Sequence, residues 1–183
     1  MRESRSSSGH RAGWRWYGQA RPPFAISPEG GQESVWDYPR PPRLVLDDRH
    51  VLVTAGGEVV AETRRALRLL ETASPPGWYF PPSDVRSDLL IPAPGASACE
   101  WKGRARYWSL RAGGAVLDRV AWSYPDPLPG FADLRDHLGF YPGRLACFVA
   151  GERVRPQPGG FYAGWITGEI VGPWKGAPGS EGW

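Results

Sequence analysis

Short runs in which apolar and polar residues alternate recur along the middle of the chain, and this two-residue period is typical of β-strands with one buried face. The clearest run is the segment 49–63, RHVLVTAGGEVVAET, in which Val51 and Val53 share a face. Gly56-Gly57 divides this run, and two glycines between alternating segments predict a two-residue hairpin turn. The return strand is expected to bury two apolar residues, Val59 and Ala61.

The next segment, 64–71 (RRALRLLE), fits two patterns. A helix would place three apolar residues on one face: Ala66, Leu69 and Leu70. A strand would align a different set: Leu67, Leu69 and Glu71. Because strands are predicted on both sides, we prefer the extended structure here.

Two longer strands are predicted in the second half of the chain. The segments 99–110 (CEWKGRARYWSL) and 115–125 (AVLDRVAWSYP) are separated by a turn at Gly113-Gly114. One face of the first strand would carry Ala105, Tyr107 and Ser109. The opposite face would carry Arg104, Arg106 and Trp108. Shorter strands are expected at 78–80 and as a closing pair over 144–156.

Helical structure is expected only in short pieces. Ser83, which follows a Pro-Pro turn, is the expected N-cap of one helical turn. Residues 129–139 predict a short helix that begins after Pro129 and ends at Gly139. The segment 91–98 (IPAPGASA) is expected to be a loop.

Composition agrees with this picture. The chain of 183 residues contains 24 Gly and 20 Pro, which suits short strands and many turns and argues against a helical bundle. The predicted fold class is therefore mainly β, a small antiparallel domain with one or two short helices and irregular extensions at both ends. The length suits one domain with a hydrophobic core.

Three parts are expected along the chain. Residues 1–34 are a polar, Pro- and Gly-punctuated extension that is predicted to be partly disordered, and residues 35–158 are the β domain. Three rings interrupt the extension: Trp14, Trp16 and Tyr17. Residues 159–183 are an irregular tail that should pack on the domain, because five of its residues are aromatic: Phe161, Tyr162, Trp165, Trp174 and Trp183.

The charge and the cysteine content of the chain limit which partners and cofactors are expected. The net charge of +3 is spread along the chain without a Lys/Arg run, so nucleic acid is not favoured as a partner. Two cysteines are too few for a disulfide framework or a four-thiolate zinc site, and no metal or cofactor is expected. The chain has neither a signal-peptide core nor an apolar run of membrane-spanning length, so a soluble, cytoplasmic protein without membrane contact is expected.

The two lysines are the most unusual feature. Lys102 and Lys175 are the only lysines beside 20 arginines, and both stand in a Trp-Lys-Gly triplet. Lysine is a compact point charge, whereas arginine is a planar fork, so a retained lysine could contact an anion, act as a base or form an imine. Both positions could also be chance survivors, and Lys175 could serve only in cation–π packing.

Several blocks occur in order over residues 40–155: GGEVVAETRRALRLLE, YFPPSDV, CEWKGRARYWSL, AWSYPDP and LGFYPGRL. Through them the chain resembles a bacterial and fungal family of unknown function that is loosely catalogued as nucleotidyltransferase-like. The terminal segments look like a longer variant of that family. The resemblance implies a tent-like or open-barrel antiparallel β fold, similar to certain zinc-binding and methionine-sulfoxide-reducing domains.

Two properties of those relatives are not carried over. Many of them bind zinc through two C-x-x-C pairs, and this chain has no C-x-x-C. Nucleotidyltransferases place paired Asp residues after a Gly-Ser dipeptide, and the single Gly179-Ser180 here lies in the tail without such a pair.

Candidate chemistry centres on Cys99, Lys102 and Asp84. An ammonium near a thiol favours the nucleophilic thiolate, so Cys99 is a candidate nucleophile, although packing as a small hydrophobe is the preferred interpretation because buried free cysteines are common. In a regular strand Cys99 and Lys102 would point to opposite faces unless a bulge formed at Gly103. Asp84 could pair with Lys102 or Arg104, or simply begin a short helix. Cys147, inside LACFV, is expected in the core.

Aromatic residues near these groups form a pocket hypothesis. The expected ligand-binding set is Lys102, Tyr79, Trp122, Tyr124, Tyr141, Arg104 and Lys175. Each ring alone could be a core residue. The preferred function is a binding module for a small anionic molecule, with the tail as a wall or lid. The alternatives are an enzyme with Cys99 as nucleophile or Lys102 as base or imine former, and an interaction factor that uses its Arg-rich first twenty residues.

Overall fold

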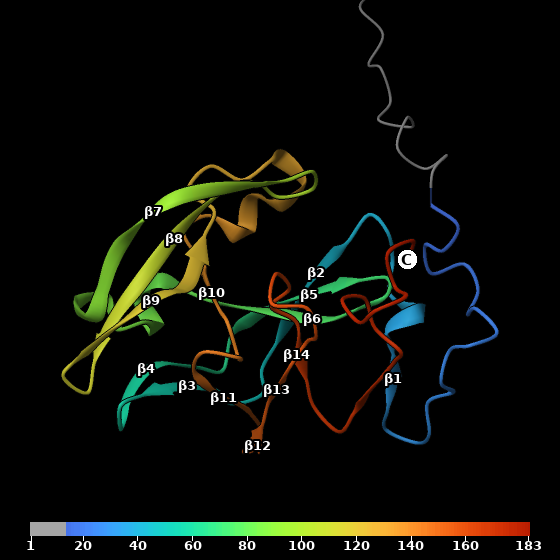
Figure 1. The fold of residues 1–183 in the computed structure, drawn as a ribbon, viewed down its shortest axis with the longest axis horizontal. Helices are drawn as coiled ribbons and strands as arrows, with labels where there is room; N and C mark the ends of the chain where they lie inside the picture. The colour runs from blue at the N-terminus through green and yellow to red at the C-terminus, as the bar shows by residue number, and fades with distance from the viewer. Residues whose placement is uncertain (1–13) are drawn as a thin grey trace, which may run out of the picture.

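A seven-stranded antiparallel sheet dominates the computed structural model, which describes residues 14–183. Its strands, in spatial order, are β2 (Arg43–Asp47), β5 (Ala66–Glu71), β6 (Ser74–Phe80), β10 (Leu138–Phe140), β9 (Ala115–Ser123), β8 (Gly103–Ala112) and β7 (Leu90–Cys99). Figure 1 shows that the sheet bends strongly, so that β7, β8 and β9 rise as one wing and β2, β5 and β6 form the other. The short strand β10 joins the two wings because it pairs with both β6 and β9.

A second antiparallel sheet has four strands and packs against the first. Its order is β12 (Glu152–Arg153), β11 (Ala146–Val149), β3 (Val51–Ala55) and β4 (Glu58–Thr63). The main hydrophobic core joins residues of both sheets, among them Val51, Val60, Phe80, Phe140 and Cys147. The predicted fold class is confirmed: the described chain is mainly β, both large sheets are antiparallel, and no closed barrel occurs within it.

The β3–β4 hairpin confirms the turn at Gly56-Gly57 but corrects one buried residue. A β-bulge follows the Val53↔Ala61 pair, and Thr54 then pairs with Val59. The extra residue shifts the alternation, so Val60 is fully buried and Val59 is 44% exposed. A strict two-residue period could not show this shift.

The ambiguous segment 64–71 forms a strand, β5, as preferred from its neighbours. Strands β2 and β6 pair with β5 on its two sides, and such pairing satisfies the backbone groups that a helix would have satisfied internally.

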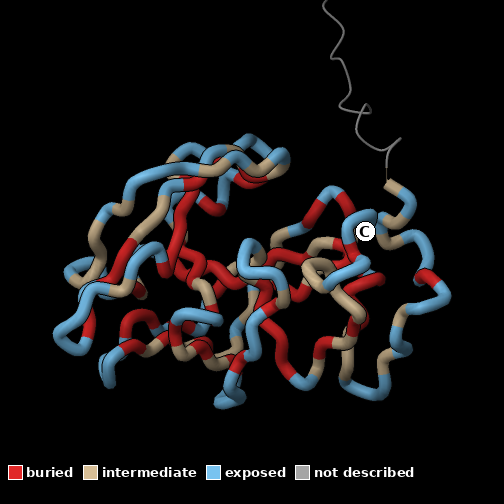
Figure 2. Tube along the Cα trace, viewed as in Figure 1, coloured by how far each residue is buried: buried red, intermediate tan, exposed pale blue. Residues whose placement is uncertain are grey.

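The segment 91–98, expected to be a loop, is part of the edge strand β7. It contains Pro92 and Pro94, which an edge strand tolerates because one of its sides makes no ladder bonds. Figure 2 shows β7 as a run of exposed and half-buried residues, in contrast to the buried central strands. The strand predicted to begin at Cys99 instead begins at Gly103, and Cys99 ends β7.

All helical pieces within residues 14–183 are short 3-10 turns: η2 (Val35–Asp37), η3 (Pro82–Asp84), η4 (Ser87–Leu89) and η5 (Pro129–Leu134). Ser83 is not a cap, because Pro81 occupies the N-cap position of η3 and makes no side-chain cap bond. The helix expected over 129–139 ends at Leu134, and Gly139 lies in β10. No helix in the described chain is long and apolar enough to cross a membrane.

The segments outside the two sheets pair with each other and with the body. The two-residue strand β1 (Glu33–Ser34) pairs in parallel with β15 (Ile170–Val171), and β13 (Arg155–Pro156) pairs with β14 (Trp165–Ile166). Trp165 is 1% exposed, lies beside Trp78 and Phe80, and donates its indole N–H to the carbonyl of Phe140 over 3.0 Å. Residues 1–13, where part of the predicted disorder falls, lie outside the described residues.

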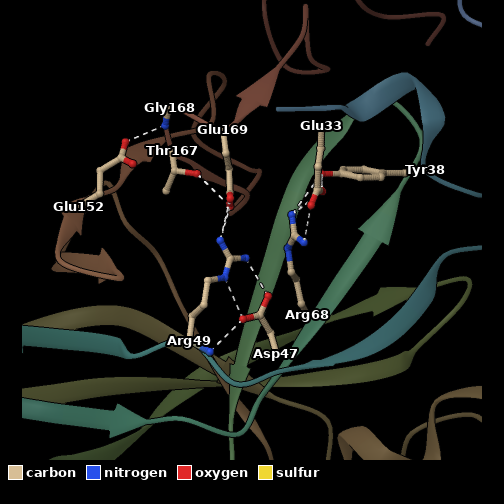
Figure 3. A network of polar contacts seen from close by, with 9 residues as sticks. All are labelled: Glu33, Tyr38, Asp47, Arg49, Arg68, Glu152, Thr167, Gly168 and Glu169. Atoms are coloured by element: carbon tan, nitrogen blue, oxygen red, sulfur yellow. Dashed lines mark hydrogen bonds and ion pairs between the residues drawn. The ribbon is translucent and has the colours of Figure 1, made fainter. Parts of the chain in front are cut away.

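Two arginines fasten these outer segments to the sheet (Figure 3). Arg49 binds Asp47 at 2.7 Å and Glu169 of the tail at 2.6 Å. Arg68 of β5 donates two hydrogen bonds to Glu33 of β1, the shorter at 2.7 Å, and Glu33 also accepts one from the hydroxyl of Tyr38. Burial alone would raise the pKa of Glu33, but its bonds to Arg68 and Tyr38 outweigh burial and lower it.

Candidate ligand-binding site

A cavity of about 250 Å³ lies on the face of the seven-stranded sheet that is turned away from the four-stranded sheet. Residues of both wings and of segment 157–164 line it. Seven of the lining residues are aromatic: Tyr79, Tyr107, Trp122, Tyr124, Tyr141, Phe161 and Tyr162. An apolar concave site with a few polar groups is the usual form of a small-molecule pocket.

One cross-strand row forms the floor of this cavity. The strand register aligns Tyr79 with Gly139, Gly139 with Trp122, and Trp122 with Tyr107. A side chain at position 139 would overlap the indole of Trp122, so glycine at this point lets the ring lie flat across β10. Tyr79 and Trp122 then meet edge to face, with centroids 5.9 Å apart. The neighbouring residues Trp78 and Phe80 point to the opposite face and belong to the main core.

Lys102 enters the cavity from the turn between β7 and β8. Its side chain is largely buried, with the residue 8% exposed, and its ammonium nitrogen lies 5.8 Å from the ring centre of Tyr124. The turn is held in place because the carbonyl of Lys102 accepts a hydrogen bond from the Leu128 amide at 3.1 Å. Within residues 14–183 the ammonium makes no ion pair, and its side-chain hydrogen-bond partner is Cys99.

The ammonium of Lys102 stays charged at neutral pH. Burial by itself would lower its pKa, but Tyr79, Cys99 and the carboxylate of Glu71 outweigh burial, and the pKa lies above its ordinary value. Burial acts in the opposite direction on the surrounding phenols and raises the pKa of Tyr79, of Tyr124 and, to about 12, of Tyr141. These phenols are therefore neutral hydrogen-bonding groups at neutral pH.

Cys99 lies beside Lys102 for a reason that the sequence did not indicate. The two residues were expected on opposite faces of one strand unless Gly103 formed a bulge. Instead Cys99 pairs directly with Gly103 across a hairpin, and residues 100–102 form the turn. Gly103 has a φ angle of +98°, which glycine adopts without strain. Cys99 and Lys102 thus both line the cavity.

The other cysteine is a core residue, as predicted. Cys147 is fully buried in β11, and burial raises the pKa of its thiol to about 12. A thiol with such a pKa is inert at neutral pH.

Two of the predicted site residues lie elsewhere. Asp84 pairs with neither Lys102 nor Arg104. Its carboxylate binds Arg65 at 2.7 Å and accepts a hydrogen bond from Thr63, and the Arg65 guanidinium foremost holds its pKa well below the usual range. Arg104 is exposed on the opposite face of β8 and lines a separate surface hollow with Arg106 and Trp108.

Lys175 lies behind the cavity wall and does not line the cavity. Its ammonium nitrogen is 5.8 Å from the ring centre of Tyr162, which is part of the wall, and 5.5 Å from that of Trp14. Burial, and secondarily the charge of Arg40, lower the pKa of Lys175. The second Trp-Lys-Gly triplet therefore supports the wall.

The tail completes the cavity on one side. Phe161, Tyr162, Ala163 and Gly164 line it together with Gln157. The Gln157 amide fixes this segment, since it donates to the carbonyl of Lys175 at 2.7 Å and accepts from the Gly164 amide at 3.1 Å. Phe161 is 75% exposed although it lines the cavity, so it stands at the mouth.

Glu71 is a lining residue that our sequence-based set omitted. It lies at the end of β5, and one carboxylate oxygen is 3.8 Å from the Nε atom of Arg40. The alternation of Leu67, Leu69 and Glu71 already placed it on the face of Leu69, which also lines the cavity, and this signal could have identified it. Within residues 14–183, no three His, Cys, Asp or Glu side chains are grouped so that they could hold a metal ion.

The chain belongs to a known protein family. A family model described as a domain of unknown function, DUF427, whose short label abbreviates NTP transferase, matches residues 43–151. The matched region covers the seven-stranded sheet and all of the four-stranded sheet except β12, while the tail that closes the cavity lies beyond it. No curated protein matches the chain.

Proposed function

We propose that this member of the DUF427 family binds a small anionic molecule in the aromatic cavity, with Lys102 as the contact for the anion. The observation that carries the proposal is the ammonium of Lys102, which lies at the wall of an otherwise largely apolar cavity without an ion pair in the described chain. A buried charge without an oppositely charged partner is costly, and a bound anion would supply that partner.

The charge state of Lys102 favours anion binding over its use as a base. A general base or an imine former must be neutral, and the raised pKa of Lys102 keeps the amine protonated at neutral pH. A protonated amine is instead a donor of three hydrogen bonds, which suits a carboxylate or phosphate oxygen.

The walls indicate the shape of the ligand. Trp122 meets Tyr79 at 5.9 Å and Tyr141 at 4.7 Å between ring centres, so flat apolar surfaces surround the space beside Lys102. A cavity of about 250 Å³ accepts only a small molecule. We therefore expect an organic anion with a flat or apolar body.

Calorimetric titration with benzoate tests the proposal. The variant Lys102→Met keeps an unbranched side chain, one atom shorter, and removes its charge. Loss of a charge-assisted hydrogen bond should weaken benzoate binding roughly tenfold or more. The comparison is Lys175→Met, which changes the lysine of the other Trp-Lys-Gly triplet, behind the wall and outside the cavity lining, and should weaken benzoate binding much less than Lys102→Met does. Equal affinity of the wild type and Lys102→Met would refute the proposal.

A second candidate function rests on the thiol of Cys99, which lines the same cavity as the ammonium of Lys102. An adjacent cation favours the thiolate, the form that acts as a nucleophile. In the folded protein iodoacetamide should alkylate Cys99 and spare the buried Cys147. Lys102→Met should slow this reaction at neutral pH. Alkylation that occurs only after unfolding would eliminate this candidate.

A further inference from the structure

The cavity is lined by two opposite charges that do not neutralise each other. Lys102 supplies an ammonium from the β7–β8 turn, and Glu71 supplies a carboxylate from the end of β5. Within residues 14–183 they form no direct ion pair, yet they are near enough for Glu71 to raise the pKa of Lys102. The two charges therefore face a shared space from two wings of the sheet.

Glu71 has one nearby cation but accepts no side-chain hydrogen bond within the described chain. The nearest cation is Arg40, whose Nε atom lies 3.8 Å from a carboxylate oxygen and has no hydrogen-bond partner itself. This separation is beyond hydrogen-bonding distance. The other nitrogens of Arg40 donate elsewhere, to the carbonyls of Thr72 at 2.9 Å and Trp16 at 3.3 Å. Arg40 thus fixes the position of the carboxylate and leaves its oxygens able to accept hydrogen bonds.

From this pair we infer that the ligand is amphoteric, with an anionic group at Lys102 and a protonated amine at Glu71, joined by a flat or apolar body. The inference rests on the proposed function and specifies its ligand class. A carboxylate that has no hydrogen-bonded partner in the described chain accepts up to four hydrogen bonds, and an alkylammonium group donates three. A protonated amine on the ligand would therefore donate hydrogen bonds to Glu71, just as the anionic group of the ligand would accept them from Lys102.

Two further cations, Arg40 and Lys175, lie outside the cavity lining. Burial lowers their pKa values, and the charges of Glu71 and Glu100 act to raise them. Neither cation lines the cavity, so neither competes for the anionic group of the ligand. A simple anion would satisfy Lys102 but would share the cavity with Glu71, a charge of its own sign that no group of the described chain hydrogen-bonds.

Three probes with one benzene body separate the possibilities: benzoate, benzylamine and meta-aminomethylbenzoate, which is zwitterionic at neutral pH. Titration calorimetry on the full chain should rank meta-aminomethylbenzoate first, roughly tenfold tighter than benzoate, because one further charge-assisted hydrogen bond is made. Glu71→Gln, which preserves the shape of the side chain, should remove this advantage while benzoate binding is kept or strengthened. Glu58→Gln, at an exposed carboxylate of β4 outside the cavity lining, is the matched control and should leave the ranking unchanged.

The outcomes distinguish the two proposals. If benzoate binds through Lys102 but meta-aminomethylbenzoate binds no tighter in the wild type than in Glu71→Gln, the amphoteric ligand is wrong and the anion site stands. If Lys102→Met binds every probe as the wild type does, the anion site itself is wrong. Because Glu71→Gln could disturb Arg40, the melting temperature of the Glu71→Gln variant is measured as well. A second variant, Arg40→Met, should rank the three probes as the wild type does, which would show that Glu71 and not Arg40 sets the preference.

Discussion

Single residues decide the floor of the cavity, and Gly139 is the clearest example. A side chain at this position would overlap the indole of Trp122, which is the ring that Tyr79 and Tyr141 contact. Gly139→Ala should therefore destabilise the fold by roughly 1–3 kcal/mol, because the ring must move in a packed environment. Urea unfolding measures the change. Gly130→Ala is the control, since no atom lies within 4 Å of a side chain there, and a similar loss in both variants would contradict this explanation.

At the same scale, some site residues could be predicted and others could not. Tyr79, Trp122, Tyr124 and Tyr141 were recognisable as aromatic residues near turns, and all four line the cavity. Asp84 could not be placed, because its partner Arg65 belongs to the segment between β4 and β5 and only the folded topology joins them. The Cys99–Lys102 neighbourhood depended on a hairpin turn that the sequence pattern presented as continuous strand.

At the scale of elements, the β7–β8 hairpin positions Lys102. Gly103 follows the lysine with a φ angle of +98°, and Gly151 has a comparable angle of +84° in the β11–β12 turn. Alanine at either position should cost roughly 1–2 kcal/mol, since side chains disfavour this backbone region. Only Gly103→Ala should also weaken benzoate binding, because it alone alters the turn that carries Lys102. Equal benzoate affinities in the two variants would show that the turn does not set the position of the ammonium.

The strands and hairpins also show why the alternation of apolar and polar residues predicted only part of the fold. It identified the β3–β4 and β8–β9 hairpins, whose turns are marked by paired glycines. It missed β7, because Pro92 and Pro94 are typical of loops and only the edge position of the strand accommodates them. It also assigned Val59 to the core in place of Val60, because a bulge is not visible in a strict alternation.

At the scale of the whole molecule, the C-terminal tail contributes both to the core and to the cavity. Trp165 is packed between Trp78 and Phe80, so Trp165→Ala should cost roughly 3–5 kcal/mol of unfolding free energy. Phe161→Ala, an exposed residue at the cavity mouth, should leave stability unchanged and weaken benzoate binding. Chemical denaturation and calorimetry separate the two effects. Strong destabilisation by Phe161→Ala, or none by Trp165→Ala, would contradict these roles.

The ion pairs that hold the outer segments make stability depend on pH. Burial would raise the pKa of Asp47, but its hydrogen bonds to Arg49 outweigh burial and lower it. The pKa of Glu33 is lowered in the same way by its hydrogen bonds to Arg68 and Tyr38. A carboxylate whose pKa is lower in the folded state stabilises the fold above its unfolded pKa of about 4 and loses this contribution as pH falls further. Unfolding free energy should therefore drop below about pH 5. Glu33→Gln should make this drop shallower, whereas Asp48→Asn, at an exposed residue, should not.

The most direct test of the anion site is a crystal structure of the protein soaked with para-bromobenzoate, located by the anomalous signal of bromine. We predict that the carboxylate lies within hydrogen-bonding distance of the Lys102 ammonium and that the ring contacts Tyr79 and Trp122. An empty cavity at saturating probe, or a bromine signal only at the exposed hollow beside Arg104 and Arg106, would contradict it.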